Sequence, residues 1–266
     1  MMGCGSIEFL QKGSCMSNHK EVSNGSNPSL LHTLRGERTA ICDDGIYHRT
    51  QVSFAYNSNR IEGNGLSLEQ VERIFETNTI GLSDDAVNVD DIVETVNHFR
   101  CVDMVIDAAE RPLTEGLIKQ LHGVLKGGTR DSSKEWFAVG RYKRLPNEVG
   151  GFETTSPEDV PGRMKKLLCD YDSIESKTFE DILDFHVEFE RIHPFQDGNG
   201  RVGRLVMFKE CLRFGIVPFI IEDSLKMFYY RGLNKWGSVR EYLIDTCLTE
   251  QDRYRRWLEY FGIGTV

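Results

Sequence analysis

A twelve-residue run from His193 to Arg204 lies between two segments whose apolar residues recur at helical spacing. It combines a histidine, a carboxylate, an asparagine between two glycines and two arginines, and Pro194 separates it from the first segment. We therefore predict a helix that ends near His193, a tight loop, and a second helix that begins near Gly200. A helix start can bind an anion through its free N–H groups. Arg201 and Arg204 would lie at the positive end of the helix dipole, where cations are unfavourable. A polyphosphate ligand bound at this position would explain two arginines there.

The rest of the sequence predicts a mostly α fold around this run. Apolar periodicity favours helices over residues 47–62, 68–77, 90–109, 114–126, 178–192, 200–214, 223–236, 239–247 and 250–260, with one more beginning near residue 156. Residues 129–155 are rich in glycine, threonine and aromatic residues, and they predict one β-hairpin or extended flap. We expect a flexible leader at residues 1–40 and a single domain over residues 41–266.

Composition narrows the class of protein. The chain has 266 residues, of which 39% are hydrophobic, enough for one sizeable core. A net charge of −9 argues against a nucleic-acid partner, whose binding surface would be basic. Seven scattered cysteines form no C-x-x-C pair, which fits a reducing compartment, and no apolar run is long enough for a membrane span. We expect a cytoplasmic protein without membrane or nucleic-acid partners.

The residue types of the run suggest proton transfer beside a phosphate site. An unperturbed histidine has a pKa near ~6.5, so His193 is suited to accept a proton near neutral pH. Asp197 is either a turn residue or an oxygen ligand for Mg²⁺. Gly198 and Gly200 would let backbone N–H groups approach an anion closely.

A zinc site is the alternative for the same histidine. His186, Glu190 and His193 are spaced i, i+4, i+7 and would share one face of the preceding helix. No H-E-x-x-H sequence and no further ligand cluster support this interpretation.

The run also matches the pattern H-x-F-x-D/E-G-N-G-R-x-x-R at every specified position, and so resembles the signature of the Fic family. The resemblance extends over about residues 45–260. It implies a helical bundle with a short β-hairpin flap beside the active site. It also implies transfer of AMP from ATP to a Ser, Thr or Tyr hydroxyl of an unknown target protein, with self-modification and homo-oligomers left open. Because Gly198 is present, AMP transfer is favoured over the phosphorylation performed by Doc-type relatives.

The resemblance implies a role for each motif residue. His193 would be the general base, Phe195 would anchor the loop in the core, and Asp197 would hold Mg²⁺. The phosphates of ATP would bind to Gly198, Asn199, Gly200, Arg201 and Arg204. The adenine pocket of the family often lies where this chain has Tyr229, Tyr230 and Asn234, although their helical spacing fits core packing equally well.

Ser58 to Gly63 resembles the inhibitory motif S/T-x-x-x-E-G/N of the Fic subclass with an N-terminal inhibitory helix. The resemblance implies that Glu62 pairs with Arg204 and so occupies the arginine that the γ-phosphate needs. Two other functions stay open at this point. One is removal of AMP from a modified target with the help of Glu62, and the other is a nucleotide-binding regulatory module without turnover.

Overall fold

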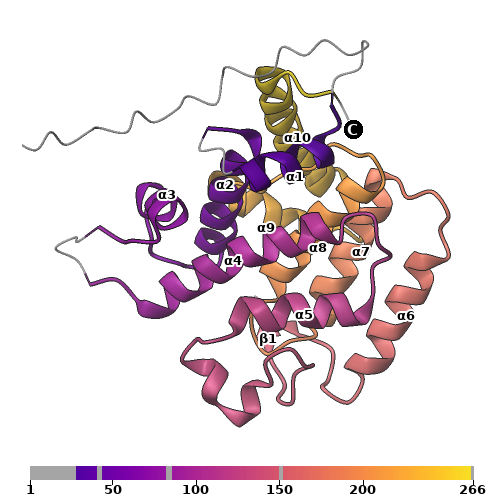
Figure 1. Ribbon diagram of the computed structural model, residues 1–266. Coiled ribbons are helices and arrows are strands. Elements are labelled where there is room, and N and C mark those ends of the chain that lie inside the picture. Colours follow the sequence, from indigo (N-terminus) through magenta and orange to yellow (C-terminus); the bar gives the residue numbers. More distant parts are fainter. Residues whose placement is uncertain (1–27, 41–43, 82–85, 150–151, 265–266) are drawn as a thin grey trace, which may run out of the picture.

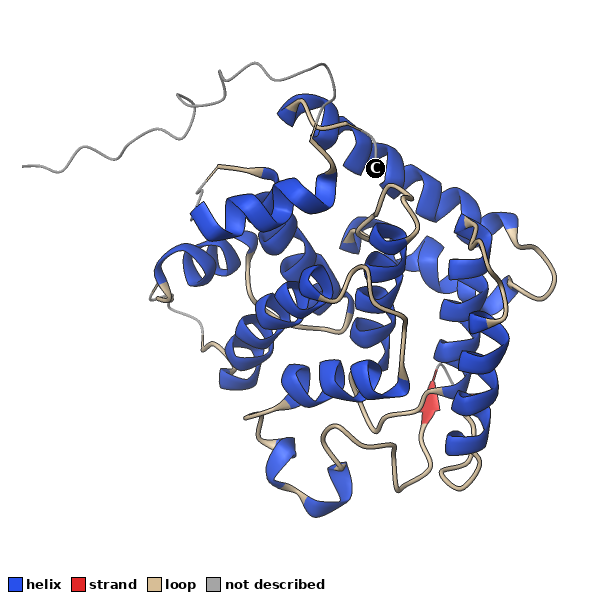
Figure 2. Cartoon of the chain, turned by 45° about the vertical axis from the view of Figure 1, so that its right-hand side comes forward, coloured by secondary structure: helices blue, strands red, loops and turns tan. Residues whose placement is uncertain are grey.

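The computed structural model describes residues 28–40, 44–81, 86–149 and 152–264 (Figure 1). These residues form mostly α-helices, as predicted, and Figure 2 shows how little strand accompanies them. The α-helices are α1 (Leu30–Ala40), α2 (Ile46–Ile61), α3 (Leu68–Thr77), α4 (Val89–Asp107), α5 (Glu115–Lys126), α6 (Val160–Asp172), α7 (Phe179–Ile192), α8 (Asn199–Arg213), α9 (Lys226–Lys235) and α10 (Glu241–Phe261). Short 3₁₀ turns occur at Asp131–Ser133, Glu135–Phe137 and Asp223–Leu225.

Helix α8 is the central element of the bundle, and nearly every one of its residues is buried. It packs against α2, α4, α5 and α7, which surround it in Figure 1. Val202, Leu205 and Phe208 belong to the main core, which also holds Phe195 from the preceding loop. The residues at the start of α8 are therefore placed in the interior of the protein, within reach of side chains from several helices.

Side-chain caps begin several of these helices. The hydroxyl of Ser67 accepts a hydrogen bond from the N–H of Gln70, and the Gln70 side chain completes a capping box at α3. Thr114 caps α5 by accepting from Leu117. Thr178 and Asp181 form a second capping box at α7, the helix that leads to His193. A cap of this kind stabilises a helix by about 1 kcal/mol.

Three predicted boundaries were wrong. Residues 30–40 form α1 and are not part of a flexible leader, because Leu30 and Leu34 are spaced i, i+4 and are both fully buried in the main core. The two helices predicted at residues 239–247 and 250–260 are one helix, α10, since its buried stripe continues through both. The helix predicted from residue 156 begins at Val160, after a turn. Residues 1–27 lie outside the described part of the chain.

Two very short strands lie in the segment that predicts a hairpin. β1 (Glu148–Val149) pairs antiparallel with β2 (Phe152–Glu153), and Val149 lies opposite Phe152. The residues between the two strands lie outside the described ranges. The expected role of this hairpin as a flap beside the active site stays a prediction.

Among the helices in the described part of the chain, none combines the length and the apolar character that crossing a bilayer requires.

Candidate active site

His193 lies at the point where α7 ends and the loop begins. Its backbone is left-handed, with φ 51° and ψ 61°, and its N–H donates to the carbonyl of Phe189. The ring Nδ1 lies 3.3 Å from the carbonyl oxygen of Glu190, so Nδ1 carries the hydrogen and Nε2 keeps its lone pair. Burial lowers the pKa of His193 to about 4, aided by the positive charge of Lys143 and opposed by the hydrogen bond to Glu190. The imidazole is therefore neutral at pH 7 and can accept a proton.

The loop after His193 is closed by the side chain of Asn199. The Asn199 Oδ1 accepts from the N–H of Phe195 at 2.8 Å, and its Nδ2 donates to the carbonyl of Phe195 at 2.8 Å. The Phe195 ring is fully buried, which bears out its expected position as the anchor of the loop. The side chain of Asn199 therefore shapes the loop, and its contact with a phosphate stays a prediction.

A residue that the sequence analysis missed supports the same loop from α5. The ring of His122 stacks on Phe195 with centroids 4.0 Å apart. Its Nε2–H donates to the carbonyl of Asp197 at 3.1 Å, and its Nδ1 accepts from the N–H of Gly140 at 2.9 Å. A lone histidine on a helix face carries no sequence signal for such a role.

Two glycines meet requirements that other residues would not. Gly198 has φ +78°, a conformation that residues with a Cβ rarely adopt. A Cβ on Gly200 would lie 2.4 Å from Oε1 of Glu62 and 3.0 Å from Nη1 of Arg204. The Gly-Asn-Gly sequence therefore allows the tight turn into α8 and the close approach of Glu62.

Glu62, which caps the end of α2, pairs with Arg204 as predicted, and Ser58 of α2 also contacts this arginine. Glu62 Oε1 lies 2.7 Å from Nη2 of Arg204. The same guanidinium donates to the carbonyl of Ser58 at 2.9 Å and to its hydroxyl at 3.0 Å. Burial alone would raise the pKa of Glu62, but the charge and hydrogen bond of Arg204 lower it overall. Glu62 is therefore ionised at neutral pH and pairs with a fully charged Arg204.

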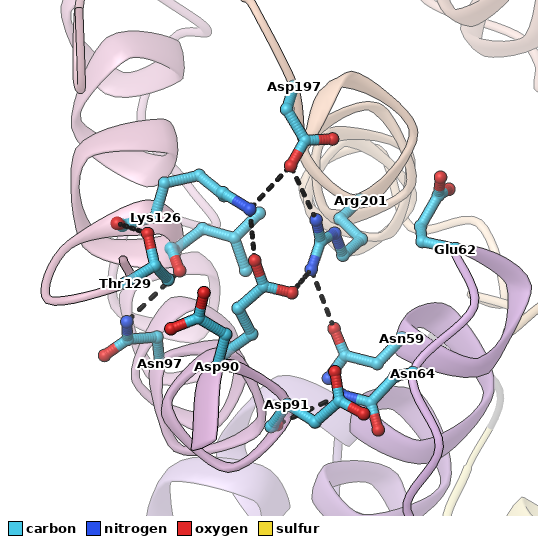
Figure 3. A network of polar contacts seen from close by, with 12 residues as sticks. Asn59, Glu62, Asn64, Asp90, Asp91, Asn97, Lys126, Thr129, Asp197 and Arg201 are labelled. Atoms are coloured by element: carbon cyan, nitrogen blue, oxygen red, sulfur yellow. Dashed lines mark hydrogen bonds and ion pairs between the residues drawn. The ribbon is translucent and has the colours of Figure 1, made fainter. Parts of the chain in front are cut away.

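Arg201 belongs to a second ionic cluster, which we call the Glu94 cluster and define as Glu94, Lys126, Asp197 and Arg201. Lys126, Asp197 and Arg201 are labelled in Figure 3. Glu94, from α4, forms ion pairs with both Lys126 and Arg201. Asp197 Oδ2 lies 2.5 Å from Nζ of Lys126 and 3.5 Å from Nη2 of Arg201. The sequence analysis missed Glu94 and Lys126, because each is a single charged residue outside any recognised motif.

Asp197 is the residue of this site that could hold a divalent cation. Burial would raise its pKa, but Arg201 and Lys126 lower it to about 2, so the carboxylate is ionised. Its side chain is half exposed, and both ion pairs use the same oxygen, Oδ2. An ionised, accessible carboxylate fits a hard cation such as Mg²⁺.

The alternative of a zinc site at His193 has no support within the described residues. The His186 Nε2 lies 2.6 Å from the hydroxyl of Tyr229 inside the core. Within the described ranges, the ligand atoms of His186, Glu190 and His193 do not converge, and the one group that does is elsewhere, at His48, Glu72 and Glu76.

The three residues predicted for an adenine pocket have different surroundings. Tyr229 is almost fully buried, and its ring centroid lies 5.9 Å from the Arg204 guanidinium carbon. The hydroxyl of Tyr230 lies 3.5 Å from the carbonyl of Ile61 at the end of α2. Asn234 is exposed. Tyr229 and Tyr230 thus lie near the Glu62–Arg204 pair, while a contact of any of the three with adenine stays a prediction.

Comparison with known proteins agrees with this fold and motif. Residues 112–211 match the model of the Fic/DOC family. Protein adenylyltransferase Fic from Nematostella vectensis is 27% identical over 193 residues, which cover 71% of this chain and 44% of that protein. Protein adenylyltransferase fic-1 from Caenorhabditis elegans is 28% identical over 218 residues, covering 77% of this chain and 41% of that protein. The chain therefore spans less than half of the length of these curated relatives.

Solved structures support the fold. A Fic domain containing signaling protein from Bacteroides thetaiotaomicron superposes with a TM-score of 0.69 at 23% identity, covering 89% of this chain and 98% of that one. Fic-1 from C. elegans superposes with a TM-score of 0.66 at 21% identity, covering 87% of this chain and 71% of that one. Fold and motif together define a helical domain with a histidine loop before a buried helix. Residues 112–211 of this chain are thus similar to the Fic/DOC family, and the fold of the chain is the mostly helical Fic fold.

Proposed function

We propose that this protein transfers AMP from ATP to a hydroxyl side chain of a target protein, and that Glu62 inhibits the transfer. The observation that carries this proposal is the neutral His193 at the loop that leads into α8, followed by the intact Gly198-Asn199-Gly200 turn. The names of the curated relatives, which are protein adenylyltransferases, point to the same reaction.

His193 is the base of the proposed reaction. Its Nε2 takes the proton from the Ser, Thr or Tyr hydroxyl of the target as the hydroxyl oxygen attacks the α-phosphorus. A new O–P bond forms, the bond between the α-phosphorus and the bridging oxygen breaks, and pyrophosphate leaves. The start of α8 and the side chains of Arg201 and Arg204 stabilise the negative charge of the phosphates. Mg²⁺ held by Asp197 would supply further charge neutralisation when bound.

The hairpin formed by β1 and β2 is the proposed binding site for an extended segment of the target, which would add to it as a further strand. Its base is tied to the catalytic loop by two hydrogen bonds. The Lys143 N–H donates to the carbonyl of Pro194 at 2.8 Å, and the Asn147 side chain donates to the carbonyl of Phe195 at 3.0 Å. A strand bound here would therefore be held in register with His193.

The proposed inhibition follows from the ion pair of Glu62 with Arg204. This pair occupies the guanidinium that would otherwise bind the γ-phosphate, and Glu62 itself would repel that phosphate. If the γ-phosphate cannot bind to Arg204, ATP binds in a different position. Its α-phosphate is then not aligned for attack by the hydroxyl of the target. The ordered α2 with Ser58 and Glu62 against α8 favours this as the resting state.

Glu62→Gly tests the proposal. This substitution frees Arg204, so we expect incorporation of label from α-labelled ATP into protein targets to rise at least tenfold. The same substitution combined with His193→Ala removes the base and should abolish labelling. ATP binding without transfer of label by the Glu62→Gly variant would identify a nucleotide-binding regulatory module instead.

Removal of AMP is a second candidate function, favoured by the ionised Glu62 carboxylate in the same site. In this reaction Glu62 would orient a water for attack on the modified target. Release of AMP from a modified target by the unaltered protein, lost in Glu62→Gly, would support it.

A further inference from the structure

The Glu94 cluster brings a buried lysine to the carboxylate that the proposed function assigns to a metal ion. Nζ of Lys126 lies 2.5 Å from Asp197 Oδ2, and only 6% of the Lys126 side chain is exposed. Arg201 approaches the same oxygen at 3.5 Å. Figure 3 shows both interactions ending on one oxygen of Asp197. This carboxylate therefore has two cationic neighbours before any ligand binds.

Glu94 holds both cations in place. It lies on α4, its side chain is 12% exposed, and it is ion-paired with Lys126 and with Arg201. Lys126 is the last residue of α5, and hydrogen bonds also hold the residues that follow it. The Asn97 side chain donates to the carbonyl of Gly127, and the hydroxyl of Thr129 donates to the carbonyl of Lys126. A lysine anchored in this way cannot swing away into solvent without breaking its ion pair with the nearly buried Glu94.

The four side chains of the cluster balance in charge. Lys126 and Arg201 each carry one positive charge, and Glu94 and Asp197 each carry one negative charge. A divalent cation that approaches Asp197 thus meets a cluster with no net charge. The carboxylate that would bind the cation is already paired with Lys126 and Arg201. Two like charges ~4 Å apart repel by several kcal/mol at the effective dielectric constant of a protein site, so the lysine must weaken metal binding strongly.

We propose that Lys126, positioned by Glu94, is a resident cation at Asp197 that limits the affinity of this carboxylate for divalent metal ions. The inference deepens the proposed function and rests on it for the role of Asp197. It implies that the metal ion enters with the phosphates of ATP, which supply the negative charge that the cluster does not. Lys126 acts through Asp197 and is a positioning residue of the site.

Titration of the full-length protein with Mn²⁺, followed by the electron paramagnetic resonance signal of the free ion, tests this proposal without nucleotide or turnover. Lys126→Met removes the resident cation, and we expect it to bind Mn²⁺ at least ~10-fold more tightly than the unaltered protein. Adding Asp197→Asn to this variant should cancel the gain. Lys126→Gln serves the same purpose if the methionine variant does not fold.

Two control variants separate this effect from simple changes of charge or packing. Lys119→Met removes one positive charge from the same helix, at a lysine paired with Glu115, and should leave Mn²⁺ affinity within about twofold of the original. Glu94→Gln removes one negative charge from the cluster and keeps an amide oxygen that can accept a hydrogen bond from Lys126 or Arg201. The cluster then carries a net positive charge, so Mn²⁺ affinity should not rise. Equal Mn²⁺ affinity in the unaltered protein and both Lys126 variants overturns the proposal, as does an equal gain in Glu94→Gln.

The outcome is independent of the test of AMP transfer. Failure of Glu62→Gly to label any protein would refute the proposed reaction and leave the Mn²⁺ result unchanged. An unaltered Mn²⁺ affinity in the Lys126 variants would refute the resident cation and leave AMP transfer intact.

Discussion

At the scale of single residues, the loop from His193 to Asn199 depends on a few polar groups in an apolar setting. Asn199 satisfies both the N–H and the carbonyl of Phe195, and neither group has access to water. Buried polar groups that lose their partner destabilise a protein more than a hydrogen bond stabilises it. The loop geometry is therefore maintained by side chains that have no direct part in proton transfer.

Asn199→Ala tests this role. It leaves two buried backbone groups of Phe195 without their partner, so we expect the free energy of unfolding to fall by about 2–4 kcal/mol. Urea denaturation monitored by circular dichroism measures the loss. The matched control is Asn234→Ala on the exposed side of α9, which should change stability by less than about 0.5 kcal/mol. Equal losses in the two variants would contradict the role of Asn199.

At the scale of elements, α1 is the helix that the sequence analysis did not predict. Its apolar residues are few, but Leu30 and Leu34 are fully buried in the same core that contains α8. Arg35 adds a hydrogen bond to the carbonyl of Ile106 at the end of α4. The helix is therefore part of the domain, and it packs beside α2, the helix that carries Ser58 and Glu62.

Leu34→Ala distinguishes a docked helix from a flexible leader. Removal of a fully buried leucine side chain leaves a cavity, so we expect a loss of about 2–4 kcal/mol in the free energy of unfolding. His32→Ala, two residues earlier on the exposed face of α1, is the control and should be nearly silent. If Leu34→Ala were equally silent in thermal unfolding, α1 would not be packed in solution.

At the scale of the whole molecule, buried titratable groups give stability an optimum in pH. Burial lowers the pKa of four histidines. The pKa falls to about 3 for His98 and His186, and to about 4 for His122 and His193. Burial raises the pKa of Glu190 to about 8 and that of Glu250 to about 7. Between about pH 4.5 and 6.5 the four histidines are protonated only in the unfolded chain, whereas the two glutamates are protonated only in the folded protein. The unfolded chain therefore binds more protons in total, and stability rises with pH.

Above about pH 6.5 the sign reverses. The unfolded histidines have then lost their protons, while Glu190 of the folded protein keeps its proton up to about pH 8, so stability falls as pH rises. We expect a maximum near pH 6.5 and a loss of about 1–2 kcal/mol between pH 6.5 and 8. Denaturation curves over this range measure it. Glu190→Gln has no carboxylate to ionise at this position and should lose less stability over this range than the unaltered protein. An unchanged slope in this variant would assign the loss to other groups, such as Glu250.

The sequence alone determined most of the helices and the centre of the site. Helical periodicity depends on residues close together in the chain, and so could be predicted from spacing. The contact of Glu62 with Arg204 was also predicted, but only because two motifs were recognised together.

Only the tertiary structure decided which distant charges complete the site. Glu94 lies 107 residues from Arg201 along the chain, and Lys126 lies 71 residues from Asp197. Both stand on helices that show no chemical motif, and only the packing of these helices around α8 brings them to their partners. The same holds for His122 beneath Phe195 and for α1 against the core. Local sequence patterns determine where helices begin and end. Which charged residues lie beside Asp197 depends instead on which helix faces pack together, and this packing places Lys126 and Arg201 against its carboxylate.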